Sequence, residues 1–455
     1  MNAHATTPRT VQAIRDAGAR PSWLIAVTVL CVGVPPGGGT PGQEASGVQV
    51  TAGDVAAAGL VAVAAFLVVT RRAAMPRQAF LAFGPVTAAL GVATVCSRDI
   101  AASLPGYVRG IQLFVLVPLA VVLLVRDRRD LAIVCGSVLA LGLGEAGYGI
   151  WQSVTGNGAS IEGEAIRAVG TFGAADVMAL SVLTGFAILV LTAFALVAPR
   201  RGTAAVLACL AGLGVLAVAL AFALSRGSWL ALGVAAALML VIFDRWVAVR
   251  TLVCCAALLL LAVATVGGGA QAVVARSRSI AGSVTTPDQS VSDRYNLWGA
   301  AQRIWQDHPV TGVGVKNFPA YRDTYASIEL SSGSETEDPV HGYVRQPLLS
   351  PHNEYLLILS EQGVVGFTGF AVLIAVILHG LWTRRRTRDP FWLIGVGVMA
   401  FLLVNFLYAD LGGPTCVLTA VLLGVAAARA LGLEPSAGPA RAAPSALFTR
   451  PLERR

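Results

Sequence analysis

Long apolar runs separated by short polar segments make up most of the chain. A helix of about 20 apolar residues is long enough to cross a bilayer. The runs cover roughly 23–34, 51–70, 79–96, 107–125, 131–153, 176–198, 204–224, 228–246, 251–275, 354–382, 391–409 and 411–431. The pattern therefore predicts about twelve transmembrane helices, of which the first is short or tilted.

Composition agrees with an all-α polytopic membrane protein. Of the 455 residues, 56% are apolar and 13% are charged, and the mean hydropathy is +0.71. A soluble protein would carry about twice that charged fraction. A closed β-barrel is disfavoured because barrel strands alternate over about ten residues, whereas these runs are continuous.

Clustered arginines predict the orientation of the chain. With the N-terminus in the cytoplasm, every cluster falls in a cytoplasmic loop, as the positive-inside rule requires. The clusters are Arg71-Arg72 with Arg77, Arg126 with Arg128-Arg129, Arg200-Arg201, Arg245 with Arg250, and Arg384-Arg385-Arg386 with Arg388. The N-terminus and the C-terminus are both expected in the cytoplasm, and the longest polar loop is expected on the opposite, periplasmic face.

This topology divides the chain into five parts. A poor cleavage pattern and the following Pro35-Pro36 argue against a cleaved signal peptide and favour an uncleaved first helix. The parts are a cytoplasmic segment at 1–22, helices one to nine at 23–275, a periplasmic loop at 276–353, helices ten to twelve at 354–432, and a disordered cytoplasmic tail at 433–455.

The charge and the cysteines exclude two other classes of protein. The net charge is +8, but almost all of the base is arginine in short clusters between apolar runs, which is typical of topology signals and not of nucleic-acid binding. The seven cysteines lie in or beside apolar runs, so neither a disulfide framework nor a CxxC metal site is predicted. Buried small side chains are the expected role.

The long polar interval, about 276–370, is where we expect the chemistry. Residues 291–306 are predicted to form a surface helix with Arg294, Trp298, Ala301 and Trp305 on one face and Asp293 turned away. Pro309 ends this helix. The following Thr311-Gly312-Val313-Gly314 is expected to be a flexible turn, since the longer fingerprint of a phosphate cradle is lacking. Residues 329–338, rich in Ser, Gly and Glu, are expected to form a mobile loop.

Two side chains in this part of the sequence have both a structural and a functional interpretation. Arg226, at a break between two apolar runs, could extend to head-group phosphates or anchor the phosphate of a lipid carrier. His352 could be a hydrogen-bonded structural residue, or could take a proton from a sugar hydroxyl near neutral pH, with Glu354 or Glu361 orienting it. A metal site is not predicted, since His308, His341 and His352 lack close ligand spacing.

Several short motifs, in this order, resemble the O-antigen ligase and O-antigen polymerase superfamily over about 170–410. They are Ser225-Arg226-Gly227, Ser292-x-Arg294 with Trp298, His308-Pro309-x-x-Gly312-x-Gly314, Pro351-His352-Asn353-x-Tyr355-Leu356, and Glu361-x-Gly363 with Gly366.

The resemblance implies a metal-independent glycosyltransferase of the GT-C type in the bacterial inner membrane, without a cofactor. Such an enzyme takes a glycan from undecaprenyl diphosphate on the periplasmic face and, in a ligase, attaches it to lipid A–core. The family's motif arginines fall on Arg226 and Arg294, and its motif histidine falls on His352. The arginines would hold the diphosphate, and the histidine would activate or position the acceptor hydroxyl. Lys316, Tyr355 and Trp298 are expected to contribute to substrate binding.

Three functions stay open from the sequence. The single dominant late loop favours a ligase, whereas a polymerase or a protein O-oligosaccharyltransferase would share the donor chemistry. A small-anion transporter is disfavoured because acidic residues are scarce in the predicted spans. The glycan, the accepting sugar and the oligomeric state are not predicted. The cavity for the prenyl chain is expected beneath the long loop, between the spans that carry Arg226 and His352.

Overall fold

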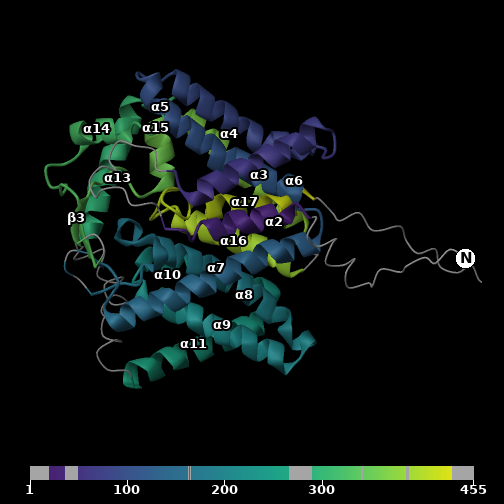
Figure 1. The fold of residues 1–455 in the computed structure, drawn as a ribbon. Helices are drawn as coiled ribbons and strands as arrows, with labels where there is room; N and C mark the ends of the chain where they lie inside the picture. The colour runs from purple at the N-terminus through teal and green to yellow at the C-terminus, as the bar shows by residue number, and fades with distance from the viewer. Residues whose placement is uncertain are drawn as a thin grey trace, which may run out of the picture.

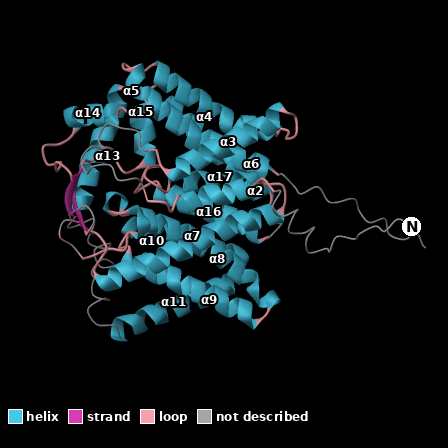
Figure 2. Cartoon of the chain, in the orientation of Figure 1, coloured by secondary structure: helices cyan, strands magenta, loops and turns pink. Residues whose placement is uncertain are grey.

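The structure, a computed structural model, describes residues 20–35, 50–161, 163, 165–265, 289–339, 342–385 and 389–432, without the side chains of 175, 200 and 258–265. It is mostly helical (Figures 1 and 2). The expectations for residues 1–19, 266–288 and 433–455 lie outside the described residues.

Eight helical segments within the described ranges are long and apolar enough to cross a membrane. One of them, Ile100–Leu124, joins α5 (Ile100–Ile111), a π-helix (Gln112–Leu116) and α6 (Val117–Leu124). The others are α3 (Ala52–Val69), α4 (Arg77–Val95), α7 (Arg128–Thr155), α8 (Ala179–Val197), α9 (Thr203–Phe222), α10 (Arg226–Phe243) and α15 (Glu354–Thr383). This confirms an all-α polytopic membrane bundle in its main feature.

Four further helices account for the remaining predicted spans. Three are apolar but shorter, namely α2 (Ser22–Cys31), α16 (Pro390–Asn405) and α17 (Cys416–Leu431). The fourth, α11 (Arg245–Thr265), ends where the described range ends. Every predicted interval thus contains a helix, while the number that actually cross the membrane stays a prediction.

Helices α17 and α8 form the centre of the bundle. In α17 every residue except Arg429 is buried, and α8 is buried over most of its length. A helix that is apolar all round has no polar face for water, so it is stable only among other helices or in lipid, and these two are surrounded by other helices. Helix α17 packs against α6, α15 and α16, and α8 packs against α7, α9 and α16. Figure 1 shows α17 in the middle of the bundle.

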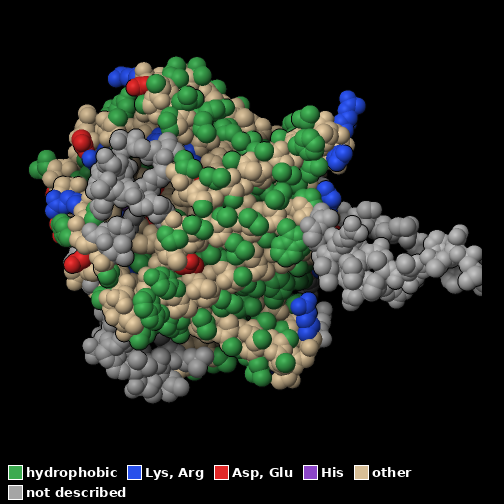
Figure 3. Space-filling view, viewed as in Figure 1, with side chains coloured by type: hydrophobic (Ala, Val, Ile, Leu, Met, Phe, Trp, Pro, Cys, Tyr) green, Lys and Arg blue, Asp and Glu red, His purple; other side chains and the backbone are tan. Residues whose placement is uncertain are grey.

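Arginines of two of the clusters, Arg128-Arg129 and Arg201, lie together at one end of this bundle. Arg20, before α2, donates to Asp127 and Asp130 at the start of α7. Arg128 and Arg129 share a surface hollow with Arg201 and Pro390, from the α8–α9 and α15–α16 connections. In Figure 3 hydrophobic side chains cover the flank, while Lys and Arg side chains gather toward the ends. The loops that carry these arginines therefore share one end of the bundle, while the orientation in the membrane stays a prediction.

The opposite end is covered by a small folded layer built from the long polar interval. It contains α13 (Gln289–Asp307), α14 (Phe318–Tyr325), β2 (Ser334–Asp338) and β3 (Gly342–Gln346). Strand β2 lies between β3 and β1 (Ser160–Ile161), and both pairings are antiparallel. The layer has an apolar core of its own: Leu297, Ala300, Ala301, Ile304, Val313, Phe318 and Leu348.

One prediction for this layer was wrong. Residues 334–338, expected within a mobile loop, form the central strand of a three-stranded sheet, so the fold is not purely helical. The predicted helix at 291–306 is confirmed as α13, in which Asp293 is buried. The Asp293 carboxylate accepts hydrogen bonds from the backbone N–H and the hydroxyl of Ser331, and these bonds allow it to be buried.

Candidate functional site

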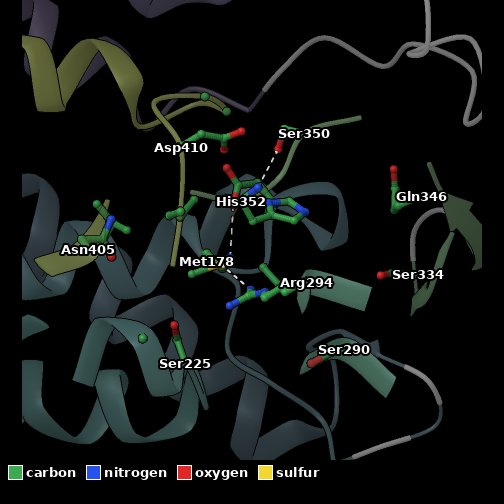
Figure 4. Close-up of a pocket in the computed structure, with 18 of the residues that line it drawn as sticks. Met178, Ser225, Ser290, Arg294, Ser334, Gln346, Ser350, His352, Asn405 and Asp410 are labelled. Atoms are coloured by element: carbon green, nitrogen blue, oxygen red, sulfur yellow. Dashed lines mark hydrogen bonds between the residues drawn. The ribbon is translucent and has the colours of Figure 1, made fainter. Parts of the chain in front are cut away.

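A cavity of about 490 Å³ lies between the bundle and the layer that covers it. The ends of α8, α10, α16 and α17 form its inner wall, and α13, the sheet and residues 346–352 form its outer wall. Arg226, Arg294 and His352 all line it, as do Ser225 and Asp410 (Figure 4). The cavity lies below the long loop, with Arg226 and His352 both in its lining, and its use by a prenyl chain stays a prediction.

Arg226 is the first residue of α10, and it lines the cavity. The preceding Leu224 has a φ of 49°, a strained conformation for a residue with a side chain. Ser225 donates to Ser228, which is within 2.9 Å of the Ser181 hydroxyl on α8, so a buried hydroxyl chain fixes the turn. A helix N-terminus carries partial positive charge, and beside a guanidinium it favours an anion.

Arg294 reaches the cavity from α13. Its Nη2 lies 3.8 Å from the sulfur of Met178, at the start of α8. The neighbouring Asp293 also lines the cavity, and its carboxylate fastens the segment before the sheet to α13.

His352 lies in the turn before α15 and lines the same cavity. Its φ of 48° is in the left-handed region, which is uncommon for a residue other than glycine, and strain of this kind gathers at functional sites. The turn is held by a bond of 2.9 Å from Trp298 Nε1 to the Pro351 carbonyl. Burial and, less strongly, the charge of Arg294 lower the pKa of His352, against an opposing effect of Asp410. The imidazole is therefore neutral at neutral pH and can accept a proton.

Two acidic residues that the sequence analysis assigned no role also line the cavity. Asp410 lies in the α16–α17 connection close to His352 (Figure 4), and its charge favours the imidazolium form. Asp176, just before α8, accepts from the Met178 backbone N–H. Burial, with a contribution from the charge of Asp410, raises the pKa of Asp176 to about 6. Their position near span ends was the one sequence feature that could have identified them.

The glycine motif of the interval is a structural clamp and not a flexible turn. Gly312 and Gly314 pack against a break in α15 where Gly363 has a φ of 61°. Backbone hydrogen bonds join Val313 to Ser360, Gly314 to Glu361, Val364 to Pro309 and Val365 to Val310. A Cβ at either Gly312 or Gly363 would meet backbone atoms of the other segment, so both positions require glycine.

The two glutamates expected to orient His352 have other partners. Glu361 accepts from the backbone N–H groups of Lys316 and Phe318, at 2.7 and 3.0 Å. Glu354 accepts from the Leu411 N–H at 2.6 Å. Both carboxylates thus fasten loops to α15, and Asp410 is the carboxylate whose charge acts on His352.

Lys316, Trp298 and Tyr355 are not among the residues that line the cavity. Trp298 supports the Pro351 turn, and the Tyr355 hydroxyl donates to the Leu403 carbonyl at 2.7 Å. Lys316 has a φ of 63° and lies against Gly106 of α5. Their predicted role in substrate binding stays a prediction, and the contacts that the structure describes are structural ones.

Three arginines that could bind an anionic group line the cavity, together with three aspartates, Asp176, Asp293 and Asp410. In addition to Arg226 and Arg294, a third arginine, Arg167, lines the cavity and is buried. Within the described ranges no group of three or more His, Cys, Asp or Glu side chains is placed to hold a metal ion. Apolar residues, among them Val182, Leu402 and Phe406, line the part of the cavity that faces the bundle.

Comparison with known proteins adds one finding. Residues 211–371 match the family model described as O-antigen ligase. The matched segment contains Arg226, Arg294 and His352, together with the glycine clamp and the break in α15. No curated protein matches the chain. The family match confirms the resemblance that the motifs predicted.

Proposed function

Because residues 211–371 support assignment to the O-antigen ligase family, we propose that the chain is a GT-C-type glycosyltransferase of the bacterial inner membrane. It transfers a glycan from undecaprenyl diphosphate to a sugar hydroxyl of lipid A–core on the periplasmic face. Transfer inverts the anomeric carbon and needs no metal ion.

The observation that carries this proposal is the convergence of Arg226, Arg294 and His352 on one cavity. They come from three elements that are far apart in the sequence: the start of α10, the first turns of α13 and the turn before α15. The cavity lies at the end of a membrane bundle, where a lipid-borne group can enter from the bilayer.

The geometry suggests how the step proceeds. Arg226 and Arg294 hold the diphosphate and stabilise the charge that develops on it as the anomeric C–O bond breaks. The acceptor oxygen attacks the anomeric carbon from the opposite face, and its proton passes to the neutral His352 imidazole. The bonding electron pair leaves with the diphosphate, and Asp410 stabilises the imidazolium.

The test is a transfer assay with purified protein in detergent, undecaprenyl-diphosphate glycan, lipid A–core acceptor and EDTA. Transfer that survives EDTA in the wild type and is lost in Arg226→Ala, Arg294→Ala and His352→Ala supports the proposal. Loss of wild-type transfer in EDTA, restored by added magnesium, would refute the metal-independent mechanism.

The products separate the related functions. Glycan that lengthens on the donor without modification of lipid A–core identifies a polymerase, and glycan on a protein hydroxyl identifies a protein O-oligosaccharyltransferase. Folded protein that transfers glycan to none of these acceptors would overturn the enzyme proposal and favour a transporter.

A further inference from the structure

We propose that the inner face of the β1–β2–β3 sheet is a carbohydrate subsite, in which Ser334, Thr336 and Gln346 bind sugar hydroxyls. The inference rests on the proposed function, since it supplies the sugar-binding part of the same cavity. It names residues to which neither the motifs nor the family match assigns a role.

The register of the sheet defines this inner face. Ser334 pairs with Gln346, and Ile161 pairs with Thr336, so these four residues lie on one side. All four line the cavity, and Figure 4 shows Ser334 and Gln346 at its outer side, across from Asn405 of α16. The alternate residues Glu335, Glu337, Tyr343 and Arg345 lie on the other side, where Arg345 pairs with Glu335.

The two faces of the sheet differ in chemistry. The outer face is charged, whereas the polar side chains of the inner face that line the cavity are two hydroxyls and one amide. Asp338 lies on the inner side too, but it is buried and is not part of the cavity lining. Hydroxyl and amide groups both donate and accept hydrogen bonds, as sugar hydroxyls do. Among the described residues, the side chains of Ser334 and Gln346 have no hydrogen-bond partner, while the Thr336 hydroxyl donates to the Val344 carbonyl and can still accept. This face is therefore equipped for a neutral, hydroxyl-rich ligand.

The position of the face fits the order of groups in a lipid-linked sugar. Apolar residues line the bundle side of the cavity, and Arg226 lines it at the start of α10. In Figure 4, Arg294 and His352 lie between Asn405 of α16 and the sheet residues Ser334 and Gln346. A prenyl chain on the bundle side and a diphosphate at the arginines would direct the attached sugar, or the incoming acceptor sugar, toward the sheet. Both sources present the same chemistry to Ser334, Thr336 and Gln346.

The sheet is also held firmly enough to select a ligand. Strand β1 comes from the α7–α8 connection and ties the hairpin to the bundle. At the base of the hairpin, Ser331 is bonded to Asp293, one residue before Arg294. Because the sheet is fixed to α13, which carries Arg294, the sugar-binding face keeps a constant position relative to the diphosphate site. Less conformational entropy is then lost when the substrate binds.

The test uses the full-length protein with Ser334→Ala, Thr336→Val and Gln346→Leu combined, and Glu337→Gln on the outer face as the matched control. Valine keeps the shape of threonine and suits a strand. Donor and acceptor are titrated separately. We expect KM for one of them to rise at least about tenfold, as the loss of one or more hydrogen bonds predicts, with kcat within about twofold and the melting temperature equal to that of the control.

The substrate whose KM rises identifies the source of the sugar. As a readout that does not need turnover, saturation-transfer NMR is recorded with lipid-free core oligosaccharide and with lipid-free donor glycan, each released by mild acid. We expect contacts with one of them in the wild type and their loss in the triple variant.

Unchanged KM values in a folded triple variant, or equal NMR contacts in wild type and triple variant, would overturn the carbohydrate subsite. The proposed glycosyl transfer would still stand in that case if Arg294→Ala abolishes transfer. If the wild type transfers nothing, the NMR comparison still decides whether the sheet binds sugar.

Discussion

Fixed positive charge is the property of Arg226 and Arg294 on which the proposed step depends. A guanidinium stays protonated at all relevant pH values and binds phosphate oxygens through two parallel hydrogen bonds. We expect Arg226→Ala and Arg294→Ala each to lower kcat by about 10²- to 10³-fold, and the lysine variants to recover part of the loss, because lysine restores charge without the fork. Steady-state rates at saturating donor provide the check, and alanine variants with wild-type kcat would contradict it.

The pH profile tests the role of His352. Because burial lowers the pKa of His352 from 6.5, the neutral base is kept until the pH falls below that value, so the acid limb of kcat should have its midpoint below pH 6.5. The charge of Asp410 raises this pKa, so Asp410→Asn should move the midpoint to still lower pH. Initial rates between pH 4.5 and 8 measure both, and a midpoint that moves upward would refute the assignment.

Asp176 provides a prediction about stability. Its pKa is raised from 3.8 to about 6, so the folded state favours the protonated acid, and stability falls as the pH rises from 3.8 through 6. A shift of this size corresponds to at most about 3 kcal/mol. Asparagine keeps an acceptor for the start of α8. Asp176→Asn should therefore melt at a higher temperature than the wild type at pH 7.5, with no difference near pH 4.

At the scale of the elements, the clamp between the glycine motif and the break in α15 fixes the position of the covering layer on the bundle. Gly312→Ala and Gly363→Ala each add a Cβ against backbone that no rotamer change can move, with a cost of several kcal/mol. We expect both variants to lose monodisperse protein or to melt well below the wild type.

The matched control for the clamp is Gly299→Ala in α13. A Cβ there comes no closer than 3.7 Å to a neighbour, the end of the Arg303 side chain. Alanine also favours a helix over glycine, so Gly299→Ala should be neutral or slightly stabilising. An equal fall in melting temperature for Gly299→Ala and for the two clamp variants would show that close packing at Gly312 and Gly363 is not the cause of the destabilisation.

Periodicity predicted the helices of the bundle better than the covering layer. Apolar runs such as 179–197 have one interpretation. In an apolar environment their backbone N–H and C=O groups must be hydrogen-bonded within the segment, and a buried or lipid-facing helix does this. The strand at 334–338 contains Ser, Glu, Thr, Glu and Asp, which have low strand propensity as a group. It forms a strand because β3 pairs with it along its whole length and β1, from far away in the sequence, pairs with its other edge. Local patterns carry no information about the distant partner.

The candidate site was predicted in part for a related reason. Arg226, Arg294 and His352 stood out as polar residues at breaks between apolar runs, and they do share a cavity. Asp410 and Asp176 lie in the same kind of break, but only the packing of α16 against α8 brings them into the cavity that His352 lines. Glu361 was assigned to His352 because the two are close in sequence, and its carboxylate is instead held by the loop that crosses α15.

For the whole molecule, the separation of the arginine loops from the cavity predicts which end faces the cytoplasm. Glu337 is exposed on the covering layer, and Arg201 is exposed at the opposite end. In a background where the exposed Cys96, Cys254 and Cys255 are serine, Glu337→Cys should react with a membrane-impermeant maleimide in intact spheroplasts, and Arg201→Cys should react only after permeabilisation. Positive charge is retained on the cytoplasmic side during insertion, and the lipid-linked donor must meet the cavity on the other side. The reverse labelling pattern would place the cavity on the cytoplasmic side and would contradict the proposed reaction on the periplasmic face.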